Sequence, residues 1–117
     1  MNSVRVIRND DHFISELDAA RGQLLVVEFV TRWSGPCIAV AEAFEGLARR
    51  YDRALFLVVD VELCPDAALS HDVQSLPTFI IFKGQIPVDT VRCADMINLE
   101  LLIADHYDNN EEEPQAR

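Results

Sequence analysis

Hydrophobic positions along the chain form short continuous runs that alternate with segments of helical spacing. A continuous apolar run is typical of a strand covered on both faces, while an apolar residue at every third or fourth position indicates an amphipathic helix. The runs predict strands over residues 4–7, 24–30, 54–61, 78–82 and 88–91. The spaced segments predict four helices: one capped by Asp10 or Asp11 and ended by Gly22, one from Ser34 to about Tyr51, one from Pro65 to about Ser70 and one capped by Asp95. This order, β-α-β-α-β-α-β-β-α, predicts an α/β fold in which a mixed central sheet is flanked by helices on both faces.

The same spacing predicts which helical side chains face the core. In the first helix they are Phe13, Ile14, Leu17 and Ala20. In the second helix they are Ile38, Ala41, Phe44, Leu47 and Ala48. In the last helix they are Ile97, Leu101 and Leu102.

The length of 117 residues is enough for one hydrophobic core, so we predict a single domain over residues 1–107. Residues 108–117 read Asp-Asn-Asn-Glu-Glu-Glu-Pro-Gln-Ala-Arg and contain no apolar residue to bury except Ala116. Such a composition predicts an acidic, disordered tail.

The charge and the cysteines narrow the class of protein. A formal net charge of −10 argues against nucleic acid or an anionic membrane as a partner, because both repel an acidic surface. No run approaches the length of a membrane span, and residues 1–5 lack the apolar region of a signal peptide. The cysteines Cys37, Cys64 and Cys93 are widely spaced, which is neither a disulfide framework nor a zinc pattern. We therefore expect reduced thiols in a cytoplasmic protein, with no metal and no cofactor.

One short segment carries most of the chemical information. Directly after the second predicted strand the chain reads Trp33-Ser34-Gly35-Pro36-Cys37. Serine is among the best helix N-caps, and proline is tolerated early in a helix because its missing N–H costs nothing there. Further recognisable segments follow in order: Val-Val-Glu-Phe at 26–29, Val-Asp-Val at 59–61, Leu-Pro-Thr-Phe at 76–79 and Phe-Lys-Gly at 82–84.

Together these segments resemble the thioredoxin family, and most closely its eukaryotic thioredoxin-like members. The family motif is Trp-Cys-Gly-Pro-Cys, so this chain has serine in place of the first cysteine. The resemblance implies the thioredoxin fold over about residues 1–107. It also implies the class of protein thiol-disulfide exchange in cell redox homeostasis, with protein or peptide substrates and thioredoxin reductase as partners.

In the family, the first cysteine attacks a substrate disulfide as a thiolate, and the second, more buried cysteine resolves the mixed disulfide. The resemblance assigns these positions to Ser34 and Cys37. An alcohol cannot supply this nucleophile, and a serine acts as a nucleophile only beside a general base. The histidines His12, His71 and His106 are all distant from Ser34 in sequence. Cys37 is then either a thiol that can still be oxidised or an inert buried one.

The resemblance implies three further features of the site. Glu28 occupies the place of a buried family acid that moves the proton of the resolving cysteine; alternatively, its longer side chain reaches solvent or pairs with an arginine. Pro77 matches the family's cis-proline, whose alternative is an ordinary proline at a strand start. The peptide groove implied by the resemblance consists of Trp33, Gly35, Pro36, Leu76, Pro77 and Cys93. Cys93 stands where the family has glycine, and is either a small surface residue or a thiol able to pair with Cys37.

Two functional hypotheses follow. In the first, the chain is a thiol-disulfide exchange protein whose dithiol reductase activity is lost or strongly impaired at Ser34. Both a natural loss and an engineered cysteine-to-serine change produce this motif. In the second, it is a redox-inactive peptide-binding or adaptor module that uses the groove around Trp33 and Pro77.

Overall fold

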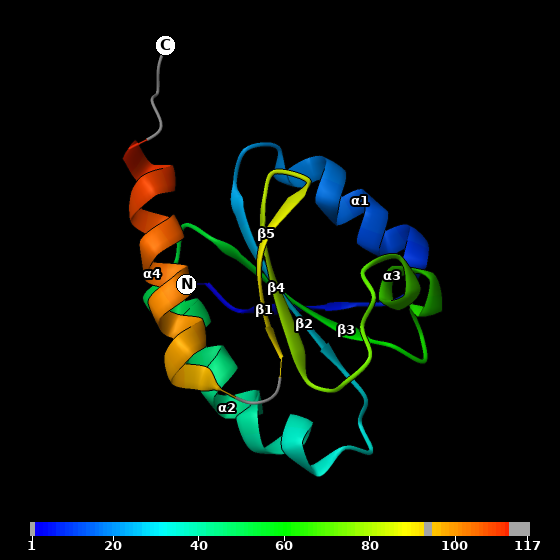
Figure 1. Ribbon diagram of the computed structural model, residues 1–117. Helices are drawn as coiled ribbons and strands as arrows, with labels where there is room; N and C mark the ends of the chain where they lie inside the picture. The colour runs from blue at the N-terminus through cyan, green and yellow to red at the C-terminus, as the bar shows by residue number, and fades with distance from the viewer. Residues whose placement is uncertain (1, 93–94, 113–117) are drawn as a thin grey trace.

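The computed structural model describes residues 2–92 and 95–112 (Figure 1). Its elements are β1 (Val4–Ile7), α1 (Asp10–Ala20), β2 (Leu24–Val30), α2 (Gly35–Arg50), β3 (Leu55–Asp60), α3 (Pro65–Ser70), β4 (Thr78–Lys83), β5 (Ile86–Arg92) and α4 (Met96–Glu112). This is the order that the hydrophobic pattern predicts, and the α/β fold class is confirmed.

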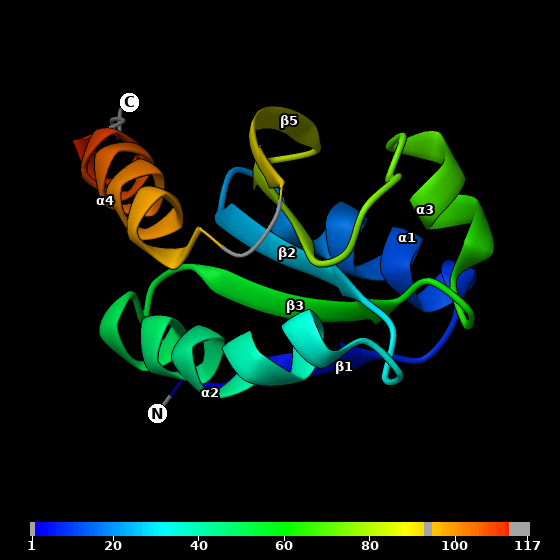
Figure 2. The same cartoon turned by 60° about the horizontal axis from the view of Figure 1, so that its bottom comes forward.

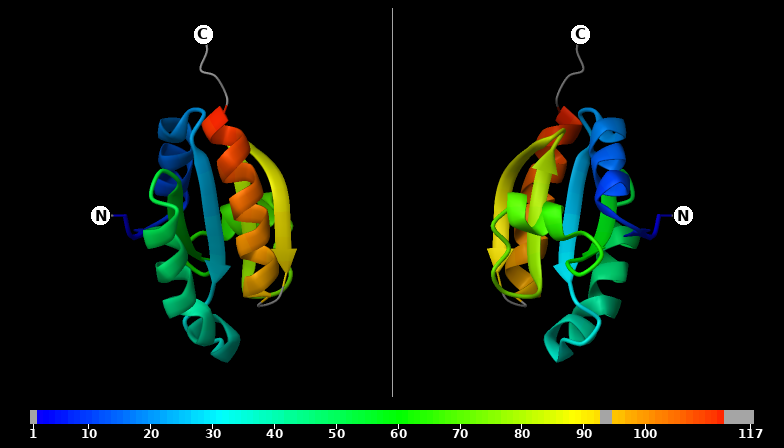
Figure 3. Two further views of the ribbon diagram at one scale, coloured as in Figure 1. Left: turned by 90° about the vertical axis from the view of Figure 1, so that its left-hand side faces the viewer. Right: turned by 90° about the vertical axis from the view of Figure 1, so that its right-hand side faces the viewer.

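The five strands form one mixed sheet with the order β1-β3-β2-β4-β5. β3 pairs in parallel with β1 and β2, while β4 runs antiparallel to β2 and to β5. The central strand β2 is buried along its length except for Val30, which is half-buried. A nearly continuous apolar sequence suits this position, because helices cover both faces of the sheet (Figure 3).

The sheet separates two hydrophobic clusters. On one face, Phe13 and Leu17 of α1 and Ala67 of α3 pack against the strands. On the other face, Phe44 of α2 and Leu99 of α4 do the same. Two helices therefore cover each face of the sheet, α1 and α3 on one side and α2 and α4 on the other (Figure 2).

Five of the side chains predicted to face the core are instead exposed. They are Ile14, Ile38, Ala41, Ile97 and Leu101. In α2 the buried stripe begins with Cys37 and Val40, and in α4 it runs through Leu99 and Ile103. Both helices carry apolar residues on more than one side, so spacing alone fits two adjacent stripes, and the contact with the sheet selects one of them.

The start of α1 also differs from the prediction. Asn9 is the N-cap, since its Oδ1 atom accepts a hydrogen bond from the backbone N–H of His12 at 2.8 Å. Neither Asp10 nor Asp11 has this role. The helix ends at Ala20, and the residue with a positive φ behind it is Arg21, with φ of 57°, rather than a glycine.

The last helix begins as predicted and ends later. Asp95 accepts a hydrogen bond from the backbone N–H of Asn98 at 3.0 Å, which is the expected N-cap contact. The helix then continues to Glu112. The prediction of a disordered tail from Asp108 is therefore wrong for residues 108–112, because an established helix gains a hydrogen bond with each added residue without a new nucleation step. Residues 113–117 lie outside the described residues.

Candidate functional site

Ser34 caps the helix that carries the motif. Its backbone is extended, its Oγ atom accepts a hydrogen bond from the N–H of Cys37 at 3.4 Å, and its carbonyl accepts the N–H of Ile38 at 3.1 Å. Pro36 stands in the first turn of α2, where no intrahelical N–H is required. The predicted N-cap is thus confirmed, and the side-chain oxygen of Ser34 is directed at the helix N-terminus.

Cys37 lies in the same turn and is buried, with 4% of its surface exposed. Its thiol and that of Cys64 are free. Cys93, which we considered as a partner for Cys37 and as part of the groove, lies outside the described residues. A thiol this well buried is poorly accessible to a protein disulfide.

Glu28 lies in the centre of the sheet, in register with Val58 on β3 and Phe79 on β4. Only 3% of its surface is exposed, and its Oε2 atom has no hydrogen-bond partner among the described residues. Burial, and secondarily the charge of Glu45, raises the pKa of Glu28 to about 7. The alternative that this side chain reaches solvent does not hold.

Glu28 and Cys37 line one surface pocket of about 160 Å³. Its other lining residues are Val30, Thr31, Arg32, Ile38, Ala41 and Val58. The Oγ1 atom of Thr31 is also buried without a hydrogen-bond partner among the described residues. Sequence reasoning did not single out Thr31, and its position immediately after β2, between Glu28 and the motif, was the available signal.

The residues of the expected groove lie near one end of the sheet. β2 ends at Val30 just before the motif, and Thr78 at the start of β4 lies opposite Phe29 of β2. The Leu76–Pro77 peptide bond, immediately before β4, is cis. The motif, which follows β2, and Pro77, which precedes β4, therefore lie at the same end of these two strands.

These groove residues differ widely in exposure. Trp33 has 76% of its surface exposed, and the Arg32 guanidinium carbon lies 5.8 Å from its ring centroid. Gly35 and Pro36 are exposed, Leu76 is half-buried and Pro77 is buried. Trp33 thus offers a large exposed aromatic surface at the motif, with the Arg32 guanidinium beside it.

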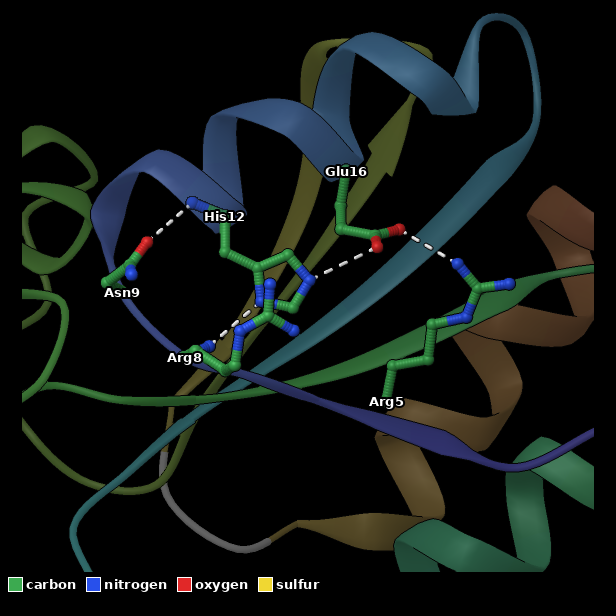
Figure 4. Close-up of polar contacts among 5 residues, drawn as sticks. All are labelled: Arg5, Arg8, Asn9, His12 and Glu16. Carbon is green, nitrogen blue, oxygen red and sulfur yellow. Dashed lines mark hydrogen bonds and ion pairs between the residues drawn. The ribbon is translucent and has the colours of Figure 1, made fainter.

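None of the described histidines is a partner of Ser34. His12 contacts Glu16 at 3.3 Å (Figure 4), and His106 contacts Asp89 at 2.6 Å. His71 packs among phenylalanine rings. Within residues 2–92 and 95–112, no group of three metal-ligating side chains is assembled, and no helix is long and apolar enough to cross a membrane.

The five-stranded mixed sheet, with the helix that Ser34 caps following the central strand, defines an α/β architecture that known proteins share. The family model "Thioredoxin" matches residues 4–104, and the chain belongs to the thioredoxin family. It is 38% identical over 100 residues to thioredoxin of Callithrix jacchus, covering 86% of this chain and 95% of that protein.

Solved structures agree with this assignment. The X-ray structure of Fasciola hepatica thioredoxin matches with a TM-score of 0.83 and 31% identity, covering 87% of this chain and 98% of the other. The chain is also 34% identical over 94 residues to a Caenorhabditis briggsae peptide-N(4)-(N-acetyl-beta-glucosaminyl)asparagine amidase. That match covers 80% of this chain but spans only 16% of the amidase. The predicted family and fold are confirmed.

Proposed function

We propose that this protein retains the protein-binding surface of a thioredoxin but lacks dithiol reductase activity. The main support for the loss of activity is that Ser34 occupies the N-cap of α2, three residues before the buried Cys37. In dithiol exchange, a thiolate attacks a substrate disulfide and forms a mixed disulfide, releasing one substrate thiolate. The second thiolate then attacks that bond, releases the other substrate thiol and leaves a disulfide in the protein.

Neither half of this reaction is available to Ser34. Its hydroxyl is not ionised near neutral pH, and no described histidine contacts it to act as a base. A disulfide between positions 34 and 37 needs two sulfur atoms, and only Cys37 carries one. We also propose the cytoplasm as the place of action, because the wide spacing of Cys37, Cys64 and Cys93 in the sequence is unlike a disulfide framework.

The exposed Trp33 favours binding as the retained function. An indole that is 76% exposed is an unusual feature for a purely structural residue, and aromatic side chains are enriched at the centres of protein interfaces. We propose protein or peptide partners for this surface, including an adaptor role.

The test compares the protein with its Ser34→Cys variant in disulfide reduction of insulin, supplied with thioredoxin reductase and NADPH. We expect turnover by the variant and none above the reductase background by the unchanged protein. A Ser34→Ala variant serves as the control, since it also lacks a thiol and should match the unchanged protein. Turnover by the unchanged protein would overturn the proposed loss of activity.

Peptide binding is measured separately with a peptide that contains no cysteine, so that no thiol-disulfide exchange can occur. Because Trp33 is the single tryptophan of the chain, its fluorescence reports occupancy of the groove directly. Saturable quenching of this fluorescence supports a binding module. The Trp33→Ala variant has no indole to observe, so its binding is measured by calorimetry and should be lost. Absence of binding at millimolar peptide would overturn this second part of the proposal.

A further inference from the structure

A second pocket lies away from the motif, between α1 and α3. These helices are neighbours on one face of the sheet (Figures 1 and 2). The pocket has a volume of about 280 Å³ and shares no lining residue with the groove around Trp33 and Pro77. Its apolar lining comes from Phe13, Leu17 and Ala67, which are buried, and from Ile14, which is 54% exposed. The predicted core position Ile14 is thus part of an open apolar wall.

The polar residues that line this pocket are mainly acidic. Asp10, Asp11 and Asp66 all contribute to it, and neither α1 nor α3 contains a lysine or arginine. His71 also lines the pocket, and burial lowers its pKa from the usual value, so its ring is neutral at pH 7. The lining therefore carries negative charge that no lining cation balances.

One cation close to α1 is engaged outside the pocket. Arg5 of β1, which approaches α1, has its guanidinium 2.9 Å from the carboxylate of Glu16 (Figure 4). That pair involves a residue of α1 that does not line the pocket. The Arg5–Glu16 ion pair thus lies outside the pocket lining, and a cation that binds the aspartates does not displace it.

One of these carboxylates is held in a fixed orientation. Asp10 accepts hydrogen bonds from the backbone N–H groups of Ala67 at 2.8 Å and Asp66 at 3.2 Å. Each carboxylate oxygen retains further acceptor capacity. A group that is already ordered loses little conformational entropy when it binds a ligand.

We propose that the pocket between α1 and α3 binds an arginine side chain, flanked by apolar residues, from a partner protein. The methylene stem packs on the apolar lining, and the guanidinium meets the aspartates at the mouth. Arginine suits this combination better than lysine, because its planar guanidinium is weakly hydrated and binds carboxylates with two parallel hydrogen bonds. The pocket is thus a second docking point that does not depend on thiol chemistry.

The probe is the peptide acetyl-Ala-Leu-Arg-Leu-Ala-amide, titrated into the ¹⁵N-labelled protein and followed by amide chemical shifts. Matched peptides carry glutamine or glutamate in place of arginine. We expect shifts concentrated in residues 10–17 and 65–71. The arginine peptide should bind about tenfold more tightly than the glutamine peptide at low salt, with the difference shrinking as salt is added. Equal binding of the three peptides, or shifts centred elsewhere, would overturn the proposal.

A pair of double variants separates this site from the general acidity of the protein. Asp11→Asn with Asp66→Asn should weaken the arginine peptide about fivefold and leave the glutamine peptide unchanged. Asp105→Asn with Asp108→Asn makes the same change in net charge on α4, across the sheet, and should have less than a twofold effect. Equal losses in both double variants would contradict a specific site. Amide shift dispersion verifies that each variant is folded. Ile14→Ser changes the apolar lining and should weaken the binding of the arginine and glutamine peptides equally.

Discussion

The carboxylate of Asp10 in α1 caps α3, since it accepts the backbone N–H of Ala67 at 2.8 Å across 57 positions of sequence. α3 needs this contact, because its own N-cap residue, Cys64, makes no side-chain capping hydrogen bond. The cap therefore joins two helices that are far apart along the chain.

Replacing Asp10 with alanine should lower the free energy of unfolding by about 1–2 kcal/mol, the usual cost of a lost cap. Asp10→Asn keeps one acceptor and should cost less than half as much. Urea denaturation provides the measurement. Asp11→Ala is the control, because it removes the same charge from the first turn of α1 without removing the cap. Equal losses for Asp10→Ala and Asp11→Ala would show that the contact with α3 is energetically unimportant.

Glu28 should make the stability of the protein depend on pH. Its pKa in the folded protein is about 7, above its ordinary value of 4.5, so the folded state binds this proton more tightly than the unfolded state. The resulting stabilisation is complete below about pH 4.5 and is lost as the pH rises through 7. Relative to Glu28→Gln, the free energy of unfolding should fall by about 2–3 kcal/mol between pH 5 and pH 8, since one unit of pKa is worth about 1.4 kcal/mol.

Urea denaturation at the two pH values tests this difference. Glu42→Gln is the matched control, because Glu42 is an exposed glutamate on α2. Its substitution should leave the pH dependence of the parent protein unchanged. A parent protein and a Glu28→Gln variant with parallel pH profiles would show that Glu28 titrates normally.

Cys64 should resist thiol reagents in the folded protein. It has no exposed surface, and burial followed by the charges of Asp10 and Asp60 raises its pKa to about 11. Because the thiolate is the reactive species, only about one molecule in a thousand carries it at pH 8. In a Cys93→Ala background, labelling followed by peptide mapping should find Cys64 unmodified until denaturant is added. Rapid modification in native buffer would contradict this expectation.

Gly84 should be intolerant of substitution. It forms the turn between β4 and β5 with φ of +65°, and a Cβ atom there would lie 2.8 Å from the backbone oxygen of Arg21. Gly84→Ala should therefore destabilise the protein by about 1–3 kcal/mol, measured as a lower urea midpoint. Gly22→Ala is the control, because a Cβ at Gly22 meets nothing within 4 Å and should change the stability by less than about 0.5 kcal/mol. Similar midpoints for the two variants would contradict the steric argument.

The hydrophobic pattern predicts the element order well because each buried strand here is a distinct apolar run. The side of each helix that faces the sheet is harder to predict. In α4, Ile97 and Leu101 form one apolar stripe and Leu99 and Ile103 form another, and only the second is buried. Helical spacing scores both stripes alike, since the choice between them depends on how the helix packs on β2, β4 and β5.

The candidate site could be predicted as far as local sequence determines it. Ser34 is an N-cap because of its own chemistry and that of the following turn, and Glu28 is buried because its strand is central. The pocket between α1 and α3 was missed because Asp11 and Asp66 belong to helices that are distant in sequence. No short-range pattern shows that these helices are neighbours, so their shared charge becomes visible only in the fold.

A dithiol site has two covalent states, and proteins that bind it can distinguish the oxidised state from the reduced one. Ser34 and Cys37 cannot be joined in this way, so the start of α2 keeps a single covalent connectivity between these two positions. A partner that contacts Trp33 therefore meets the same bonding arrangement whether its surroundings are reducing or oxidising. Because the bonding between these two residues does not change with the redox potential, the concentration of the partner would determine how much complex forms.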